Sequence, residues 1–100
     1  MSTAFELFMT EASAHSDAWL TAVQKLGEAS ALDPKTAHLA YLAVLAALRL
    51  ESGVPFHTLL AKRSGASRAE VVSALLVGLP AAGNAVVQCL PAALAAFDAD

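Results

Sequence analysis

Two histidines with apolar neighbours are the residues of this chain best suited to chemistry. His38 precedes Leu42 and Leu45 at helical spacing, so the three share one face of an expected helix, and Arg49 continues that face. His57 follows a helix break and lies in the first turns of the next expected helix. Because imidazole exchanges protons near neutral pH, these residues predict acid–base catalysis.

A carboxylate and a cation lie close to the histidines in the sequence. Glu51 stands in the break, and a helix–break–helix arrangement brings His38, Arg49, Glu51 and His57 near one another. The candidate catalytic residues are therefore His57, His38 and Glu51, with Arg49 or the helix N-terminus holding a small anionic ligand. Structural roles are the alternatives: an interior or interface histidine for His38, a solvated residue for Glu51, and a solvent-directed side chain or a Glu51 partner for Arg49.

The chain has one cysteine, Cys89, within an apolar helical stretch. A single cysteine excludes two-cysteine redox chemistry and a disulfide within the chain, and its setting predicts a buried, inert thiol. Cysteine usage of this kind is typical of a reducing compartment, and the first residues lack a basic segment followed by an apolar one. We therefore expect no signal peptide and a cytoplasmic location.

Metal and nucleophile chemistry have little support in the sequence. His38 and His57 form no His-x-x-x-His pair and have no clustered carboxylates beside them, so we predict no metal and no cofactor. Ser52 and Ser64 lie in no recognisable nucleophile motif. Acid–base chemistry remains the main prediction.

The elements that must position these residues are all expected to be helical. The chain is rich in alanine and has no alternating β-branched runs, which favours helix throughout one domain of residues 1–100. Asp33-Pro34 predicts a helix start, Ser67 and Glu70 predict a capping box, and Pro91 either kinks the last helix or marks a boundary within it. The expected helices, about six in an all-α bundle, span residues 3–13, 16–28, 34–50, 54–64, 68–78 and 81–97.

The composition predicts self-association. The chain is 57% hydrophobic and 15% charged, against about 45–50% and about 25% in typical globular domains. Because so short a chain buries only about 60–65% of its surface, we expect an obligate homo-oligomer. The net charge of −3 and the scattered basic residues argue against nucleic-acid binding.

A membrane span is the alternative use of the apolar excess. Residues 71–97 carry no charge and are long enough to cross a bilayer. Two prolines, two glycines, Asn84 and Gln88 interrupt the run, and Gly78-Leu79-Pro80-Ala81 is typical of a break between helices. Two helices in an apolar core are therefore the preferred prediction, with no membrane partner.

Four segments of the chain form a pattern through their order and spacing: Leu32–Leu39, Ala46–Leu48, Phe56–His57 and Gly65–Val71. Together they resemble the carboxymuconolactone decarboxylase and alkylhydroperoxidase D-like superfamily. A fifth segment, Gly78–Asn84, is similar to the G-x-P-A-A-N segment of the decarboxylase branch, with Gly83 as an extra residue. The resemblance covers residues 20–97 and implies an alkylhydroperoxidase D-like helical bundle that assembles as a homotrimer or homohexamer.

The functional residues implied by the resemblance are only partly present. The glutamate of the redox branch falls on His38, its Cys-x-x-Cys pair falls on Leu50 and Gly53, and its final histidine is His57. The decarboxylase branch commonly has a glutamate four residues before the histidine, which is again Gly53. Glu51 lies two residues from that position.

Two functions are therefore compared. The first is a divergent member without the redox cysteines, with acid–base or decarboxylase-type chemistry on a small carboxylate or lactone at His57, assisted by His38 or Glu51. The second is a non-enzymatic oligomer that binds a small molecule or a partner, so whether the chain is an enzyme stays open. Peroxidase activity would rest on the resemblance alone, because a thiolate nucleophile and a resolving thiol are missing.

Overall fold

The computed structural model describes residues 2–99, and every regular element among them is a helix. This confirms the all-α prediction. The elements are α-helices α1–α7 and two 3₁₀ segments, η1 and η2, so the count of about six helices is not confirmed. The chain forms two compact units, and the boundary between them lies between Asp33 and Pro34.

The first unit consists of α1 (Thr3–Glu11) and α2 (Ser13–Ala29). The Ser2 hydroxyl accepts a hydrogen bond from the Phe5 N–H at 3.1 Å and caps α1. Neither helix buries an apolar side chain, and the exposed apolar side chains of α2 include Leu26, which is 70% exposed. The unit therefore has no hydrophobic core of its own.

The second unit begins with α3 (Pro34–Leu48), which starts where Asp33-Pro34 predicted. The helix ends two residues before the expected Leu50, because Arg49 adopts a left-handed conformation with φ of 60°. The Leu50 N–H then donates to the Leu45 carbonyl at 2.9 Å, which closes the turn. The short η1 (Glu51–Gly53) and α4 (Val54–Arg63) follow, so the chain reverses directly after Arg49.

Helix α5 (Arg68–Leu76) starts with the predicted capping box. The Glu70 N–H donates to the Ser67 hydroxyl at 3.0 Å, and the Ser67 N–H donates to the Glu70 carboxylate at 2.9 Å. Two otherwise unpaired donors are thereby satisfied at the start of the helix.

The single helix expected over 81–97, with a kink or a boundary at Pro91, is divided in the structure. The structure has α6 (Leu79–Ala82), then η2 (Gly83–Cys89), then α7 (Leu90–Asp98). Gly83 has φ of 73°, which breaks the helix, and Pro91 stands in the first turn of α7, where its missing N–H costs no hydrogen bond. Pro91 therefore marks a boundary rather than a kink.

The same interruptions bear on the membrane alternative. By length and composition alone, Arg68–Asp98 would be long and apolar enough to cross a bilayer. The structure divides this stretch into α5, α6, η2 and α7, whereas a spanning helix needs about 20 continuous residues. Several of its residues lie in the core, including Val71, Leu75 and Val86, which favours the packed-helix prediction.

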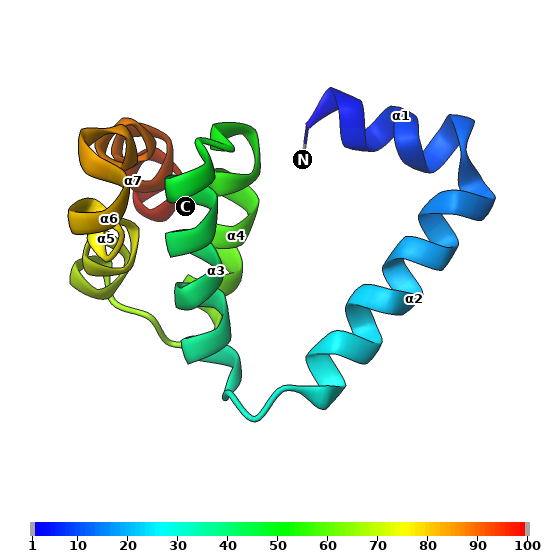
Figure 1. The fold of residues 1–100 in the computed structure, drawn as a ribbon, viewed down its shortest axis with the longest axis horizontal. Coiled ribbons are helices and arrows are strands. Elements are labelled where there is room, and N and C mark those ends of the chain that lie inside the picture. Colours follow the sequence, from blue (N-terminus) through cyan, green and yellow to red (C-terminus); the bar gives the residue numbers. More distant parts are fainter. Residues whose placement is uncertain (1, 100) are drawn as a thin grey trace. The chain divides into compact units, whose positions relative to one another are not determined.

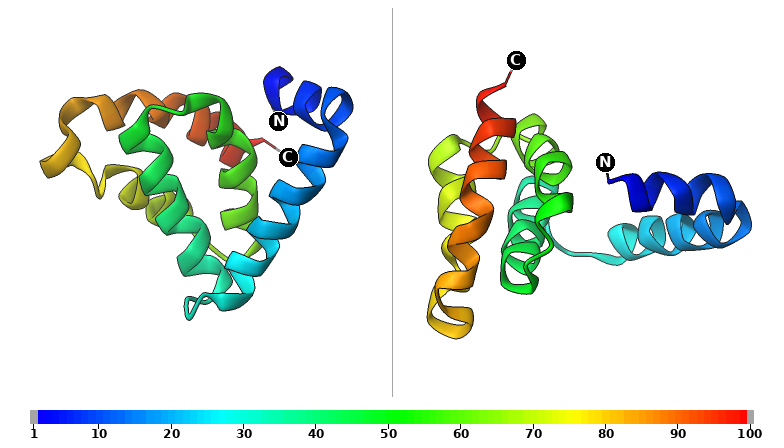
Figure 2. Two further views of the ribbon diagram at one scale, coloured as in Figure 1. Left: turned by 45° about the vertical axis from the view of Figure 1, so that its right-hand side comes forward. Right: turned by 90° about the horizontal axis from the view of Figure 1, so that it is seen from above.

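In the second unit, α3 and α4 form one layer, and α5, η2 and α7 form the other (Figures 1 and 2). The core between the layers includes Leu42, Val54, Val71, Leu75 and Val86, each with no exposed surface. Polar contacts fix the end of α7 to α4 and α5. The Lys62 ammonium donates to the Phe97 carbonyl at 2.6 Å, and the Arg68 guanidinium pairs with Asp98 at 2.9 Å. This frame holds the α3–α4 turn, where the candidate residues lie.

Candidate functional site

His57 lies between two aromatic rings at the α3–α4 turn. Its ring centroid is 4.4 Å from that of Tyr41 on α3, at an interplanar angle of 40°. The Phe56 ring lies 5.3 Å away at 83°, an edge-to-face contact. Gly53 lies beneath the imidazole, since a Cβ on Gly53 would be 3.9 Å from His57 Cδ2. The imidazole is therefore half-buried in largely apolar surroundings.

The environment lowers the pKa of His57 below 6.5. Removal of water by burial is the larger cause, because it disfavours the charged imidazolium. The Coulombic interaction with His38 is the second cause. His57 is therefore neutral at pH 7, the form in which an imidazole accepts a proton.

The structure thus brings His38 and His57 into one electrostatic neighbourhood, as the sequence predicted. His38 is half-buried on α3, and Leu42 and Leu45 beyond it are buried. Sequence reasoning missed the contribution of Tyr41. The signal that could have found it is its spacing, because Tyr41 lies three residues after His38 on an adjoining part of the helix surface.

Neither Glu51 nor Arg49 affects the pKa of His57 as His38 does. Glu51 is exposed in η1, and its charge acts on Cys89, where it helps to raise the pKa of the thiol. Arg49 is also exposed, and within residues 2–99 its guanidinium makes no hydrogen bond or ion pair with Glu51 or any other residue. Among residues 2–99, no carboxylate or guanidinium contributes to the pKa shift of His57.

Cys89 lies apart from the histidines, in η2, and has no exposed surface. Burial is the main cause that raises the pKa of its thiol, followed by the charge of Glu51, so the thiolate is disfavoured. Leu50 and Gly53 stand where the resemblance places the redox cysteines, and neither carries a thiol. No three His, Cys, Asp or Glu side chains within residues 2–99 are placed to hold a metal ion.

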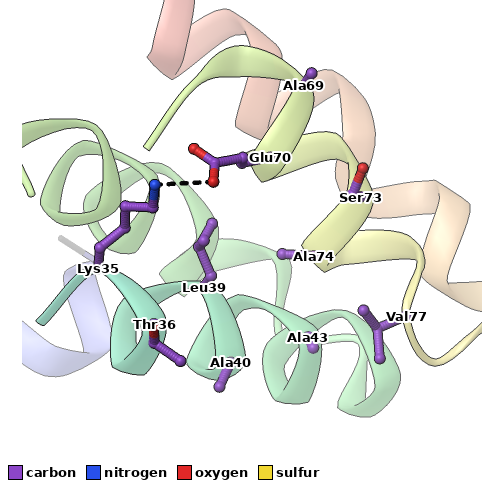
Figure 3. Close-up of a pocket in the computed structure, with 10 residues that line it drawn as sticks. All are labelled: Lys35, Thr36, Leu39, Ala40, Ala43, Ala69, Glu70, Ser73, Ala74 and Val77. Carbon is purple, nitrogen blue, oxygen red and sulfur yellow. Dashed lines mark ion pairs between the residues drawn. The ribbon is translucent and has the colours of Figure 1, made fainter. Parts of the chain in front are cut away.

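A concave surface lies between α3 and α5, on another side of α3 from His38 and Tyr41 (Figure 3). It is an open groove of about 620 Å³ with mostly apolar walls. The Lys35 ammonium and the Glu70 carboxylate form an ion pair at 2.9 Å along it. The lining residues are Lys35, Thr36, Leu39, Ala40, Ala43, Ala69, Glu70, Ser73, Ala74 and Val77.

Comparison with known proteins gives one family. The sequence profile of the Carboxymuconolactone decarboxylase family matches residues 14–99, which is most of the chain. No curated protein and no solved structure matches the chain significantly. The match agrees with the resemblance carried by the sequence motifs and with the all-α fold.

Proposed function

Because this chain belongs to the Carboxymuconolactone decarboxylase family, we propose that it carries out acid–base chemistry at His57 on a small carboxylate or lactone, without thiol redox steps. The observation that carries the proposal is the half-buried His57 imidazole in contact with the Tyr41 and Phe56 rings, where burial lowers its pKa. A histidine with a pKa below 6.5 is in its basic form at neutral pH.

The proposed reaction moves a proton at a carbon or oxygen atom of the substrate. His57 accepts the proton and returns it later in the cycle, and His38 assists as a second proton carrier. Glu51, the other assistant expected from the sequence, is not beside His57 and is left out of the proposed reaction. The N-terminal end of α4, on which His57 lies, holds the substrate anion. The aromatic walls exclude water and favour a substrate with an apolar body.

The test is a screen of small lactones and carboxylates against the wild-type protein and His57→Ala. Loss of turnover in His57→Ala, with turnover retained in the matched control His15→Gln, is the expected result. His15 is exposed in the first unit and distant in sequence from the site. An unchanged rate in His57→Ala on any substrate that the wild type converts would rule out this role.

Thiol peroxidase activity provides a separate check on the missing redox pair. We expect no thiol-dependent reduction of an alkyl hydroperoxide, because Leu50 and Gly53 stand at the cysteine positions and Cys89 is buried. Sustained turnover that survives Cys89→Ser would contradict the proposed absence of peroxidase activity.

The second candidate function is non-enzymatic binding of a small molecule, and the groove between α3 and α5 favours it. Its walls are mostly apolar, and Lys35 and Glu70 offer a charged pair to a polar head group. A ligand that shifts the NMR signals of groove residues such as Ala43 and Ser73, and that is recovered unchanged, would support binding over catalysis.

We also propose that the protein is a homo-oligomer, a trimer or a hexamer as family membership implies. Large apolar side chains remain exposed in both units, among them Trp19 at 54%, Leu48 at 62% and Val77 at 69%. Exposed apolar side chains in such number favour burial between subunits. Light scattering at micromolar concentration tests this, and a stable monomer would contradict it.

A further inference from the structure

No hydrogen bond orients the His57 imidazole within the part of the chain that the structure describes, and no ion pair does so there. A catalytic histidine is commonly oriented by a hydrogen bond from one ring nitrogen to a carboxylate, which fixes the ring plane and the tautomer. If His57 is to move a proton in a defined direction, another contact must therefore fix the plane of its ring.

Tyr41 makes a closer ring contact with the imidazole than Phe56 does. The Tyr41 centroid is 4.4 Å away at an interplanar angle of 40°, so the two rings partly face each other. The Phe56 pair is edge-to-face, and its centroids are 5.3 Å apart. Because an edge-to-face pair needs the larger separation, the imidazole cannot turn edge-on to Tyr41 unless the two rings move apart.

The two aromatic rings also differ in the helix from which they come. Phe56 precedes His57 on α4, so it moves with His57 and does not fix the imidazole relative to α3. Tyr41 is next to buried Leu42 on α3, and His57 is next to buried Thr58 on α4. The Tyr41–His57 pair therefore joins the two helices beside their buried contact.

The edge of the imidazole is bounded as well as its face. A Cβ on Gly53 would lie 3.9 Å from His57 Cδ2 and 3.6 and 3.7 Å from the Leu45 methyl carbons. The Cδ2 edge of the ring thus lies against the η1 backbone. With this edge on Gly53 and one face toward Tyr41, two sides of the imidazole are in contact with groups outside α4.

We propose that Tyr41 is a positioning residue for His57 in the acid–base chemistry proposed above, on which this inference rests. Its ring holds the imidazole in one plane and ties it to α3, where His38 lies three residues before Tyr41 on the same helix surface. A fixed plane directs the lone pair of the neutral imidazole, and proton transfer needs its donor and acceptor within hydrogen-bond reach. The aromatic ring of Tyr41, and not its hydroxyl group, performs this role.

Two substitutions separate the ring of Tyr41 from its other properties. Tyr41→Phe keeps the ring and removes the hydroxyl group, whereas Tyr41→Leu removes the ring and keeps an apolar side chain. Tyr41 is 47% exposed, so neither change opens a cavity in the core. Leu48→Ala is the matched control, because Leu48 lies two turns further along α3 and is 62% exposed.

Kinetics on any substrate that the wild type converts distinguish positioning from substrate binding. We expect Tyr41→Leu to lower kcat about 2- to 12-fold, the range that corresponds to the contribution of one aromatic pair, with KM nearly unchanged. Tyr41→Phe and Leu48→Ala should keep the wild-type kcat. An equal loss in Tyr41→Phe would assign the role to the hydroxyl group and overturn the inference, as would a raised KM at unchanged kcat.

Nuclear relaxation of the His57 ring tests the inference without any substrate, so its result is independent of whether the proposed reaction occurs. In protein labelled with carbon-13 histidine there are three imidazoles, and His57→Gln identifies the signal of His57. The order parameter of its ring C–H bonds should stay above about 0.6 in the wild type, Tyr41→Phe and Leu48→Ala, and fall below about 0.6 in Tyr41→Leu.

Circular dichroism and urea denaturation of the same proteins separate positioning from packing. A side chain that only packs would lower the free energy of unfolding when replaced and leave the order of the His57 ring unchanged. Equal order parameters in the wild type and Tyr41→Leu would therefore overturn the inference, and so would the same fall in Tyr41→Phe. A fall confined to folded Tyr41→Leu is the result that the inference predicts.

Discussion

Gly53 is the position where the structure allows the most exact prediction for the site. Its backbone angles, φ of −86° and ψ of −14°, lie in a region that all L-residues adopt. A Cβ there would meet the Leu45 methyl carbons at 3.6 and 3.7 Å and His57 Cδ2 at 3.9 Å, which are ordinary van der Waals contacts. The substitution Gly53→Ala therefore adds no strain and removes conformational entropy from the unfolded chain.

The expected gain in the free energy of unfolding is about 0.4–1 kcal/mol. In a domain of this size, about 1 kcal/mol corresponds to a rise of about 4–8 °C in melting temperature. The assay is urea denaturation followed by circular dichroism, with a thermal scan alongside. A loss of more than about 0.5 kcal/mol would show that Leu45 and His57 leave no space for a methyl group and would refute the reasoning.

Gly65 is the matched control because it has space for a methyl group but a backbone conformation that disfavours one. Nothing lies within 4 Å of a Cβ at Gly65, but φ is +96°, which L-residues rarely adopt. Gly65→Ala should therefore lower the free energy of unfolding by about 1–2 kcal/mol, with a sign opposite to that of Gly53→Ala. Equal effects at the two glycines would contradict the assignment of the difference to φ.

Four further predictions concern single side chains. Thr58→Val should raise the free energy of unfolding by about 1 kcal/mol in urea denaturation, because the buried Thr58 hydroxyl oxygen has no hydrogen-bond partner among residues 2–99. A lower free energy of unfolding would indicate that the hydroxyl has a partner. Ser67→Ala should lower the free energy of unfolding by about 0.5–2 kcal/mol in urea denaturation, because the capping box is lost. An unchanged free energy of unfolding would show that the cap does not contribute to stability. Because the folded pKa of His57 lies below its unfolded value, the unfolded chain binds more protons just below pH 6.5; stability should fall there as the pH decreases, and His57→Gln should flatten this slope. Gly53→Glu should raise the pKa of His57 relative to Gly53→Gln in an NMR titration, and equal pKa values would show that the new carboxylate does not reach the imidazole.

Local signals in the sequence predicted most of the fold. Asp33-Pro34 placed the start of α3, and Ser67 with Glu70 placed the start of α5, because caps and prolines act within one helical turn. The end of α3 at Leu48 and the break at Gly83 were not predicted, whereas the boundary at Pro91 was one of two alternatives that the sequence left open. Arg49 adopts φ of 60°, a conformation that no local sequence preference favours. Gly83 breaks the helix within a stretch whose sequence pattern is otherwise helical.

The candidate site was predictable in part. The apolar spacing on α3 and the break before His57 placed the two histidines on consecutive helices, and in the structure His38 lies close enough to affect the pKa of His57. The contact of Tyr41 with His57 depends on how α4 rotates against α3, and the relation of Glu51 to Cys89 depends on how η2 packs against α3. These are tertiary contacts, which helical periodicity alone does not specify.

The central claim is that His57 is a neutral base in apolar surroundings, held so by burial and by the nearby charge of His38. An NMR titration of the His57 imidazole in the wild type and in His38→Gln tests it most directly. The account predicts a pKa below 6.5 in the wild type, because desolvation and His38 both disfavour the imidazolium, and a higher pKa in His38→Gln. A wild-type pKa at or above 6.5, unchanged in His38→Gln, would contradict the account.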